Sequence, residues 1–192
     1  MPDPNNAALD FLLNRRSRPA KTLQPPAPDR EALMPLLTAA ARTPDHGKLE
    51  PWRFIVLERP ALARLADLAE ARGKTLGMDD AACQKARSQY DQGHLAVAVI
   101  AAPKPSEKIP EIEQIYSAGA ACLALLNAAL ASGWGANWLS GWPSHDRDFV
   151  TEGLELGTDE TVAGLIFLGT ERATPPERPR PDLSQIVSWV SE

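Results

Sequence analysis

Hydrophobic residues follow two different spacings along this chain, and the spacing changes from segment to segment. Apolar positions three or four residues apart, as at Leu9, Leu12 and Leu13, are typical of helices that bury one face. Continuous β-branched and apolar runs, as in residues 95–100, are typical of buried strands. Strands are expected at 53–57, 95–100, 137–140 and 162–168, and helices at 6–16, 29–40, 60–73, 79–91, 109–132 and 146–154. The pattern therefore predicts a sheet that alternates with helices along the chain.

Prolines and charges modify this pattern in three places. Pro35 lies inside the second predicted helix, where a proline costs about 3 kcal/mol, so this helix is expected to begin later or to be kinked. The charged helices joined at 73–77 form an excursion that is a candidate lid. The segment 174–181 (TPPERPRP) cannot form regular structure, because proline lacks a donor and fixes φ. After it, residues 186–190 (IVSWV) are apolar, so we expect residues 174–192 to be an arm that packs on a partner subunit, with a disordered tail as the alternative.

Length and composition exclude several classes of protein. The 192 residues have the length of a single domain, 1–192, that can bury a core without disulfides. Cys83 and Cys122 are 39 positions apart with no histidine pair nearby, so neither a disulfide framework nor a zinc site is expected. The net charge of −5 argues against a nucleic-acid partner. The N-terminus lacks a basic segment followed by an apolar run, so we expect a cytoplasmic protein.

The longest uncharged segment could be taken for a membrane span. No Asp, Glu, Lys or Arg lies between Gln114 and Asp146, which is longer than the roughly 20 residues that a bilayer requires. However, residues 117–132 are mostly Ala and Leu, contain Asn127 and are followed by Gly133. We therefore expect no membrane span but a buried core helix that reaches a subunit interface.

Two arginine-bearing segments carry the first candidate chemistry. The segment 15–18 (RRSR) offers guanidinium groups and a hydroxyl that can bind a phosphate, although cations there also stabilise the C-terminus of a helix. The segment 41–52 (ARTPDHGKLEPW) is stiffened by prolines and contains Arg42, His46 and Trp52. Trp52 offers an aromatic face for a ligand, and the alternative is a solvated loop with Trp52 anchored in the core. Phosphate at one end and a flat ring at the other indicate flavin mononucleotide (FMN).

A third segment, 132–143 (SGWGANWLSGWP), combines three tryptophans with three glycines. Glycines let the backbone approach a ligand closely, which suits a planar heterocycle. The alternative is a helix that ends at glycine, followed by core tryptophans. The sequence has no GxGxxG after the first strand, no phosphate loop, no HExxH and no GxSxG. Any chemistry is therefore expected to be carried by a cofactor.

Taken together, these segments resemble the nitroreductase family. The matching motifs are FLLNRRS at 11–17, AARTPDH at 40–46, EPWRFIV at 50–56, SAG at 117–119, WLSG at 138–141 and FLGT at 167–170. The resemblance runs from about residue 8 to 170. It implies an α+β three-layer sandwich with a central mixed sheet flanked by helices. It also implies an intertwined homodimer with two FMN molecules at the subunit interface.

The resemblance also assigns roles to residues. It implies that one subunit holds FMN through Arg15, Arg16, Ser17, Trp138, Leu139 and Ser140, and that the other subunit contributes Arg42 and His46. Contacts with NADPH or NADH are expected in the stretch Ala128, Ala129, Leu130, Ala131, Ser132 and Gly133. No catalytic acid, base or metal is implied. Many relatives place a basic residue for the phosphate beyond Thr170, a role for which Arg172, Arg178 and Arg180 compete in this chain.

The leading hypothesis from the sequence is an FMN-dependent NAD(P)H oxidoreductase. It would reduce nitroaromatic compounds, quinones or similar planar acceptors by ping-pong hydride transfer. One alternative is a flavin-consuming lyase of the same superfamily, and another is a flavin-binding module without turnover. The sequence does not choose between NADH and NADPH, because no ribose-binding motif is recognised, and it does not identify the physiological acceptor.

Overall fold

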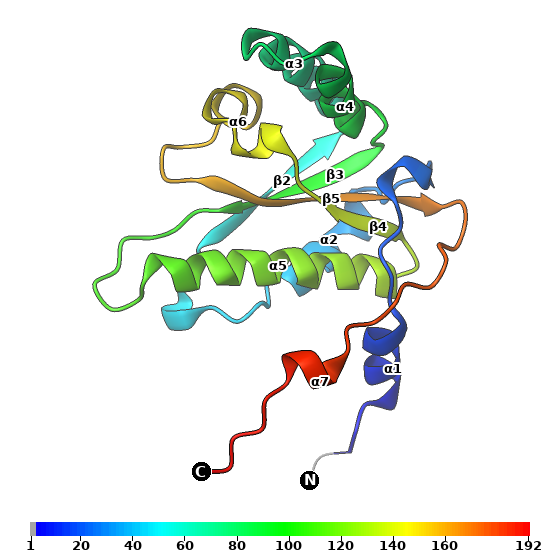
Figure 1. Ribbon diagram of the computed structural model, residues 1–192, viewed down its shortest axis with the longest axis vertical. Coiled ribbons are helices and arrows are strands. Elements are labelled where there is room, and N and C mark those ends of the chain that lie inside the picture. The colour runs from blue at the N-terminus through cyan, green and yellow to red at the C-terminus, as the bar shows by residue number, and fades with distance from the viewer. Residues whose placement is uncertain (1–2) are drawn as a thin grey trace.

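A computed structural model describes residues 3–192 and arranges them in three layers (Figure 1). The middle layer is a five-stranded sheet of order β1–β5–β3–β2, in which β4 also pairs with β5. The strands are β1 (Leu23–Gln24), β2 (Trp52–Glu58), β3 (Leu95–Ala101), β4 (Gly135–Leu139) and β5 (Thr161–Glu171). The predicted α+β sandwich is confirmed, and each of the four strands predicted from the sequence is present.

The strand pairs differ from the expected mixed sheet. Within residues 3–192 all the pairs are antiparallel: β1 with β5, β2 with β3, β3 with β5, and β4 with β5. The reason is clearest between β2 and β3. Two antiparallel helices connect these strands and return the chain to the end of β2. Glu58 at the end of β2 therefore faces Leu95 at the start of β3.

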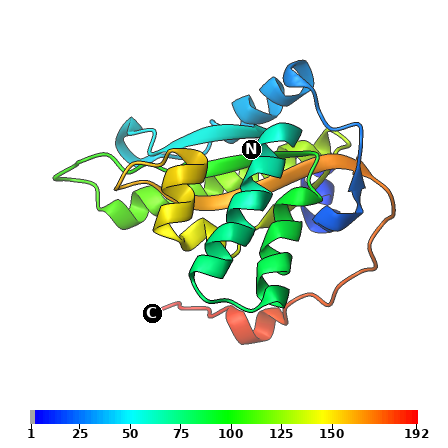
Figure 2. The same cartoon turned by 90° about the horizontal axis from the view of Figure 1, so that it is seen from above.

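Helices cover both faces of the sheet (Figures 1 and 2). One face carries α3 (Arg59–Thr75), α4 (Asp80–Asp91) and α6 (Arg147–Leu154), and the other carries α2 (Arg30–Ala40) and α5 (Glu111–Ala131). The start of α2 is fixed by Asp29, whose carboxylate accepts a hydrogen bond from the Ala32 amide at 2.9 Å. The helix begins there and continues through Pro35, so the later start that was considered is wrong.

The buried residues form two clusters, one on each face of the sheet. Strand β3 supplies both clusters because successive side chains of a strand point to opposite faces. Ala96, Ala98 and Ile100 belong to the cluster under α3, α4 and α6, whereas Val97 and Val99 belong to the cluster under α2 and α5. This explains why the whole strand is apolar and buried.

The helical excursion, α3 and α4, is packed against the sheet and against itself. Tyr90 is buried against Phe149 of α6, with ring centroids 5.6 Å apart. Gly73 of α3 leaves room for α4, because a Cβ atom at this position would lie 2.8 Å from the Cys83 sulfur. Arg87 binds the carboxylates of Asp67 and Glu70 at 2.6 and 2.9 Å. These contacts hold the hairpin in one position, and its role as a lid stays a prediction.

Helix α5 is long and apolar enough to cross a membrane, but in this structure it serves as a core helix. Its inner face packs on α2, β3, β4 and β5. Its outer face is apolar and exposed, with Ile112, Tyr116 and Leu123 among its residues. Gly119 lies on the same helix, and a Cβ atom added there would meet nothing within 4 Å. Packing within one chain therefore does not explain why the outer face of α5 is apolar.

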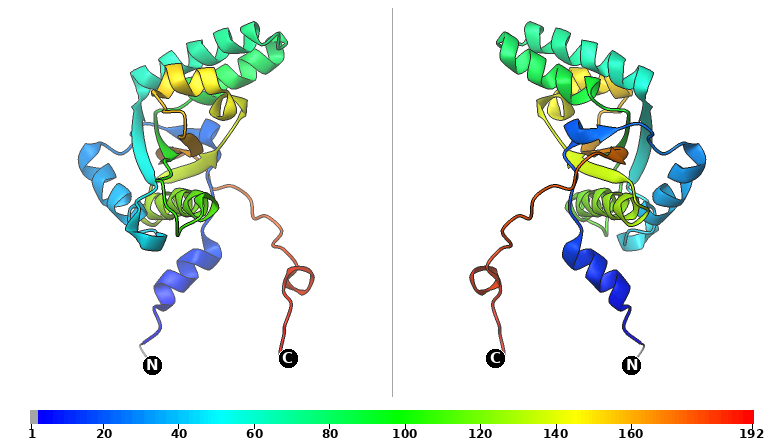
Figure 3. Two further views of the ribbon diagram at one scale, coloured as in Figure 1. Left: turned by 90° about the vertical axis from the view of Figure 1, so that its left-hand side faces the viewer. Right: turned by 90° about the vertical axis from the view of Figure 1, so that its right-hand side faces the viewer.

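The two ends of the chain extend from the body on the side of α5 (Figure 3). Helix α1 (Asn6–Asn14) has no buried residue, and its leucines at 9, 12 and 13 are exposed. The C-terminal arm contains only the short helix α7 (Leu183–Ile186), and Trp189 is 94% exposed. A nine-residue helix is marginal in water without tertiary packing. Both ends thus present apolar side chains that nothing in the described part of the same chain covers.

The two cysteines are expected to be unreactive in the folded protein. Both are buried, and burial raises the pKa of the Cys122 thiol to about 12. Because the thiolate is the reactive form, a thiol reagent such as DTNB should label neither cysteine in native protein and both in urea. Rapid labelling of one thiol under native conditions would contradict this prediction.

Candidate functional site

Arg15 and Arg16, two of the three predicted phosphate-binding residues, line one cavity of about 470 Å³. This arginine cavity lies between the end of α1 and the end of α5, and its wall includes Arg15, Arg16, Arg18, Leu130, Gly133, Trp134 and Glu171. The Arg18 amide donates a hydrogen bond of 2.8 Å to the Ala136 carbonyl, which fixes the arginine segment against β4. The structure therefore brings residues of the 15–17 group next to part of the 128–133 stretch.

The arginine cavity has the chemistry of an anion site. The Nε atom of Arg15 is buried without a hydrogen-bond partner, and its Nη2 atom lies 3.2 Å from the Ser17 hydroxyl. Burial and the neighbouring cations Arg180, Arg18 and Arg16 lower the pKa of Arg15. A phosphate would relieve the mutual repulsion of these arginines and supply the missing acceptor. The residues present thus fit the phosphate end of FMN.

Trp138 and Leu139 are the last two residues of β4, and their side chains point to opposite faces of the sheet. Leu139 packs on the cluster under α3, α4 and α6. Trp138 is 36% exposed, and its indole lies over Gly164 of β5, where a Cβ atom would overlap the ring. The exposed Ser140 hydroxyl lies 3.1 Å from Nε2 of His145. Gly164 was not predicted from the sequence, because its role depends on pairing between strands that are distant in the chain.

The variant Gly164→Ala is expected to displace the Trp138 indole with little loss of stability, because this indole is partly exposed rather than part of the buried core. Intrinsic tryptophan fluorescence should change, and FMN affinity should fall about threefold to tenfold, as expected for about 1 kcal/mol of lost ring contact. Gly157→Ala is a matched control, since its Cβ atom would lie 3.7 Å from the nearest side-chain atom. Equal behaviour of the two variants would remove Trp138 from the site.

The loop with Arg42 and His46 is held rigidly at the other end of α5. The carboxylate of Asp45 accepts hydrogen bonds from the amides of Leu49 and Glu50 at 3.2 and 2.6 Å. Gly47, Lys48 and Glu50 all have positive φ values of 74°, 56° and 49°. Non-glycine residues in this region are uncommon and gather at functional sites. The loop is therefore more constrained than an ordinary solvated connection.

Two contacts join this loop to α5. His46 Nδ1 lies 2.7 Å from Oε2 of Glu113 in the first turn of the helix. Trp52 donates from its indole nitrogen to the Ser117 hydroxyl at 3.1 Å, and this hydroxyl donates to the Pro44 carbonyl at 2.8 Å. Trp52 thus anchors the loop, and because it also lines the cavity beside Arg42, an aromatic face for a ligand stays a prediction. Arg42 remains exposed at a shallow cavity of about 340 Å³.

The two halves of the predicted site do not meet within one chain. Glu113, which contacts His46, and Leu130, which lines the arginine cavity, are 17 positions apart on α5. At a rise of 1.5 Å per residue they lie roughly 25 Å apart. One FMN molecule cannot contact both ends of this helix in the same subunit. Within one subunit, the residues predicted for a single FMN molecule therefore lie in two separate places.

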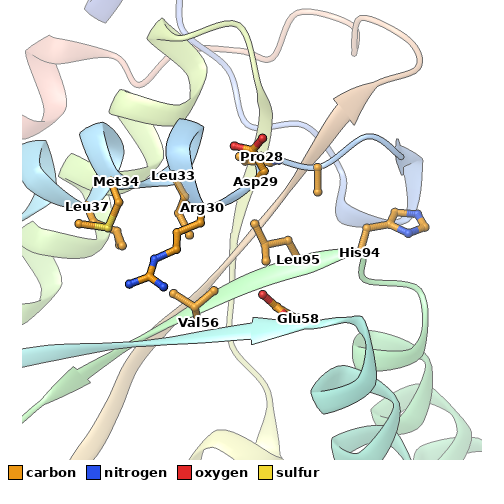
Figure 4. A pocket seen from close by; sticks show the side chains of 11 residues that line it. Pro28, Asp29, Arg30, Leu33, Met34, Leu37, Val56, Glu58, His94 and Leu95 are labelled. Carbon is orange, nitrogen blue, oxygen red and sulfur yellow. The ribbon is translucent and has the colours of Figure 1, made fainter.

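A further cavity of about 530 Å³ lies between α2 and the strands β2 and β3. Figure 4 shows Leu33, Met34 and Leu37 of α2 facing Val56 of β2, with Glu58 and His94 at one end. None of the predicted site residues lines this cavity. No sequence motif predicted it, because its walls come from separate segments with ordinary core residues.

Comparison with known proteins decides the family. The nitroreductase family model matches residues 12–170. The chain belongs to the nitroreductase family. It is 37% identical over 163 residues to the Escherichia coli K12 protein named "Putative NAD(P)H nitroreductase YdjA", covering 85% of this chain and 87% of that protein. It is 34% identical over 165 residues to a Haemophilus influenzae protein named "Putative NAD(P)H nitroreductase", with coverage of 85% and 88%.

Solved structures show the same fold. A nitroreductase-like protein from Bacillus cereus has a TM-score of 0.75 at 20% identity and covers 99% of this chain and 98% of its own. A point variant of NfnB, an FMN- and NADPH-dependent nitroreductase from Sphigopyxis sp. strain HMH, has a TM-score of 0.73 at 17% identity, with coverage of 95% and 98%. Family membership and the named relatives together support an oxidoreductase.

Proposed function

We propose that this protein is an FMN-dependent NAD(P)H oxidoreductase that reduces nitroaromatic compounds, quinones or similar planar acceptors. The observation that carries the proposal is the arginine cavity, where Arg15 has a buried, unpartnered Nε atom beside the end of α5. The family supplies the expectation of a flavin, and this cavity supplies a place for its phosphate. The free, buried thiols favour the cytoplasm as the compartment.

The residues of this chain would bind and orient the reactants. Arg15, Arg16 and Ser17 would hold the phosphate, while Trp138, Leu139 and Ser140 would border the ring from the end of β4. When bound, FMN supplies the hydride-transfer chemistry. The stretch from Ala128 to Gly133 would lie beside NADPH or NADH. Holding donor and acceptor about 3–3.5 Å apart supplies much of the rate enhancement, so no acidic or basic catalytic residue is required.

The proposed assembly is an intertwined homodimer with two shared sites. Three observations support it: the separation of the two half-sites along α5, the apolar outer face of this helix, and the uncovered ends of the chain. An obligate interface resembles a domain core cut in half, which describes the outer face of α5. The arm formed by residues 174–192 would pack on the partner subunit and cover its own exposed tryptophan.

The first test is an absorption spectrum of purified protein, followed by anaerobic addition of NADPH to one sample and of NADH to another. A bound flavin that bleaches supports a reductase, and the faster nucleotide is the donor. Parallel lines in double-reciprocal plots with a quinone would support the ping-pong order. A flavin that stays oxidised would favour a binding module, and flavin consumed under oxygen would favour a lyase. Protein that binds no flavin, even after FMN is added, would refute the proposal.

A further inference from the structure

A carboxylate of the C-terminal arm, Glu177, pairs with an arginine of the cavity wall. Oε2 of Glu177 is 3.2 Å from Nη1 of Arg16, and its Oε1 atom is 3.1 Å from Nη2 of Arg180. Arg180 also donates to the Leu13 carbonyl at 3.2 Å, near the end of α1. Glu177 therefore bridges an arginine of the cavity wall and an arginine of the arm.

The position of Glu177 makes this bridge exchangeable. The Arg16 side chain is only 12% exposed, whereas Glu177 is 67% exposed. The pair of Glu177 with Arg180 joins two exposed groups and contributes little to stability, whereas the mostly covered Arg16 needs an anion, so Glu177 can leave at low cost when another anion takes its place. A phosphate carries more negative charge than a carboxylate and has three acceptor oxygens, so it is the stronger partner for two guanidinium groups.

The cavity wall itself contains two carboxylates, Asp10 and Glu171. Asp10 belongs to α1 and accepts a hydrogen bond from the Asn14 side chain at 2.9 Å. Glu171 belongs to β5 and pairs with Arg18 at 2.6 Å, with both side chains largely covered. Its backbone is held by the sheet, where Glu171 faces Leu23 of β1. Glu177 lies in the proline-rich segment without regular structure, so its backbone is not held in this way. Of these three carboxylates, Glu177 is the one outside a helix or strand, so it is the one placed to move when an anion enters.

We propose that Glu177 is a resident counterion of the phosphate position, which the phosphate of FMN displaces while Arg16 and Arg180 exchange one anion for the other. The inference rests on the proposed FMN function and assigns to Arg180, rather than to Arg172 or Arg178, the role of the C-terminal cation. Glu177 thereby lowers the affinity for FMN and links the arm to cofactor loading.

The test compares FMN with riboflavin, which has the same ring system and no phosphate. Dissociation constants are measured by flavin fluorescence on flavin-free, full-length protein. Glu177→Gln should tighten FMN binding about threefold to tenfold, the size expected when a weak exposed ion pair no longer competes. Arg180→Ala should weaken FMN binding by a similar factor. Neither variant should change riboflavin binding.

Two control variants match the charge changes. Asp91→Asn removes a carboxylate that pairs with Arg59 at 3.0 Å on the surface, and Arg178→Ala removes a cation two positions before Arg180. Both should bind FMN as the wild type does. An unchanged or weaker FMN affinity of Glu177→Gln, or an equal gain for riboflavin, would overturn the inference while leaving the FMN function intact. Failure of the wild type to bind FMN would overturn both.

Discussion

Arg15→Ala and Arg42→Ala should each lose FMN, and a mixture of the two variants should recover part of it. Arg15 lines the arginine cavity, and Arg42 lies on the loop at the opposite end of α5. Loss of a charge-assisted hydrogen bond costs about 1.5–3 kcal/mol, so each variant should bind FMN about tenfold to a hundredfold more weakly. Flavin absorbance after gel filtration measures the occupancy.

The mixture tests whether the two arginines come from different subunits. If each site takes Arg15 from one subunit and Arg42 from the other, a hybrid dimer has one intact site and one site lacking both arginines. Random exchange of subunits should restore about a quarter of the sites. The matched control mixes wild type with the double variant Arg15→Ala/Arg42→Ala. There, hybrid dimers should have no intact site, and the opposite pattern would place both arginines in the same subunit.

The layers of the fold could be predicted because helix and strand periodicities are local properties of the chain. The apolar run at 95–100 predicted β3, and the apolar spacing at 29–40 predicted α2, although Pro35 wrongly suggested a later start for this helix. The antiparallel pairing of β2 with β3 was not predicted, because it depends on the direction in which α3 and α4 return the chain. The spacing of apolar residues along the sequence contains no information about that direction.

The candidate site was predicted unevenly for a related reason. Arg15, Arg16, Arg42 and His46 stand in motifs that resemble a known family, so their positions could be named from the sequence. Glu177 has no such motif, and its role follows only from distances to Arg16 and Arg180 in the folded chain. The arm is rich in proline, so it has no periodicity from which contacts could be inferred.

The other large effect is expected at the proposed subunit interface, for the variant Ala120→Glu. Ala120 is an exposed residue of α5, one position from Gly119 and on the charge-free segment. In a single subunit a glutamate at this position would face water, so the fold should be retained. In a dimer closed over α5, an unpaired carboxylate would be buried at a cost of several kcal/mol. The variant should therefore be a folded monomer.

Ala71→Glu is the matched control, because Ala71 is an exposed alanine of α3 on the opposite side of the sheet. Sedimentation or light scattering gives the mass, and absorbance gives the flavin content. Ala120→Glu should lose both the dimer and the flavin, and Ala71→Glu should keep both. Since the half-sites lie roughly 25 Å apart on one helix, a monomer cannot complete the site. A monomeric variant that retained FMN at full affinity would thus refute the shared site, even if the interface itself were correctly placed.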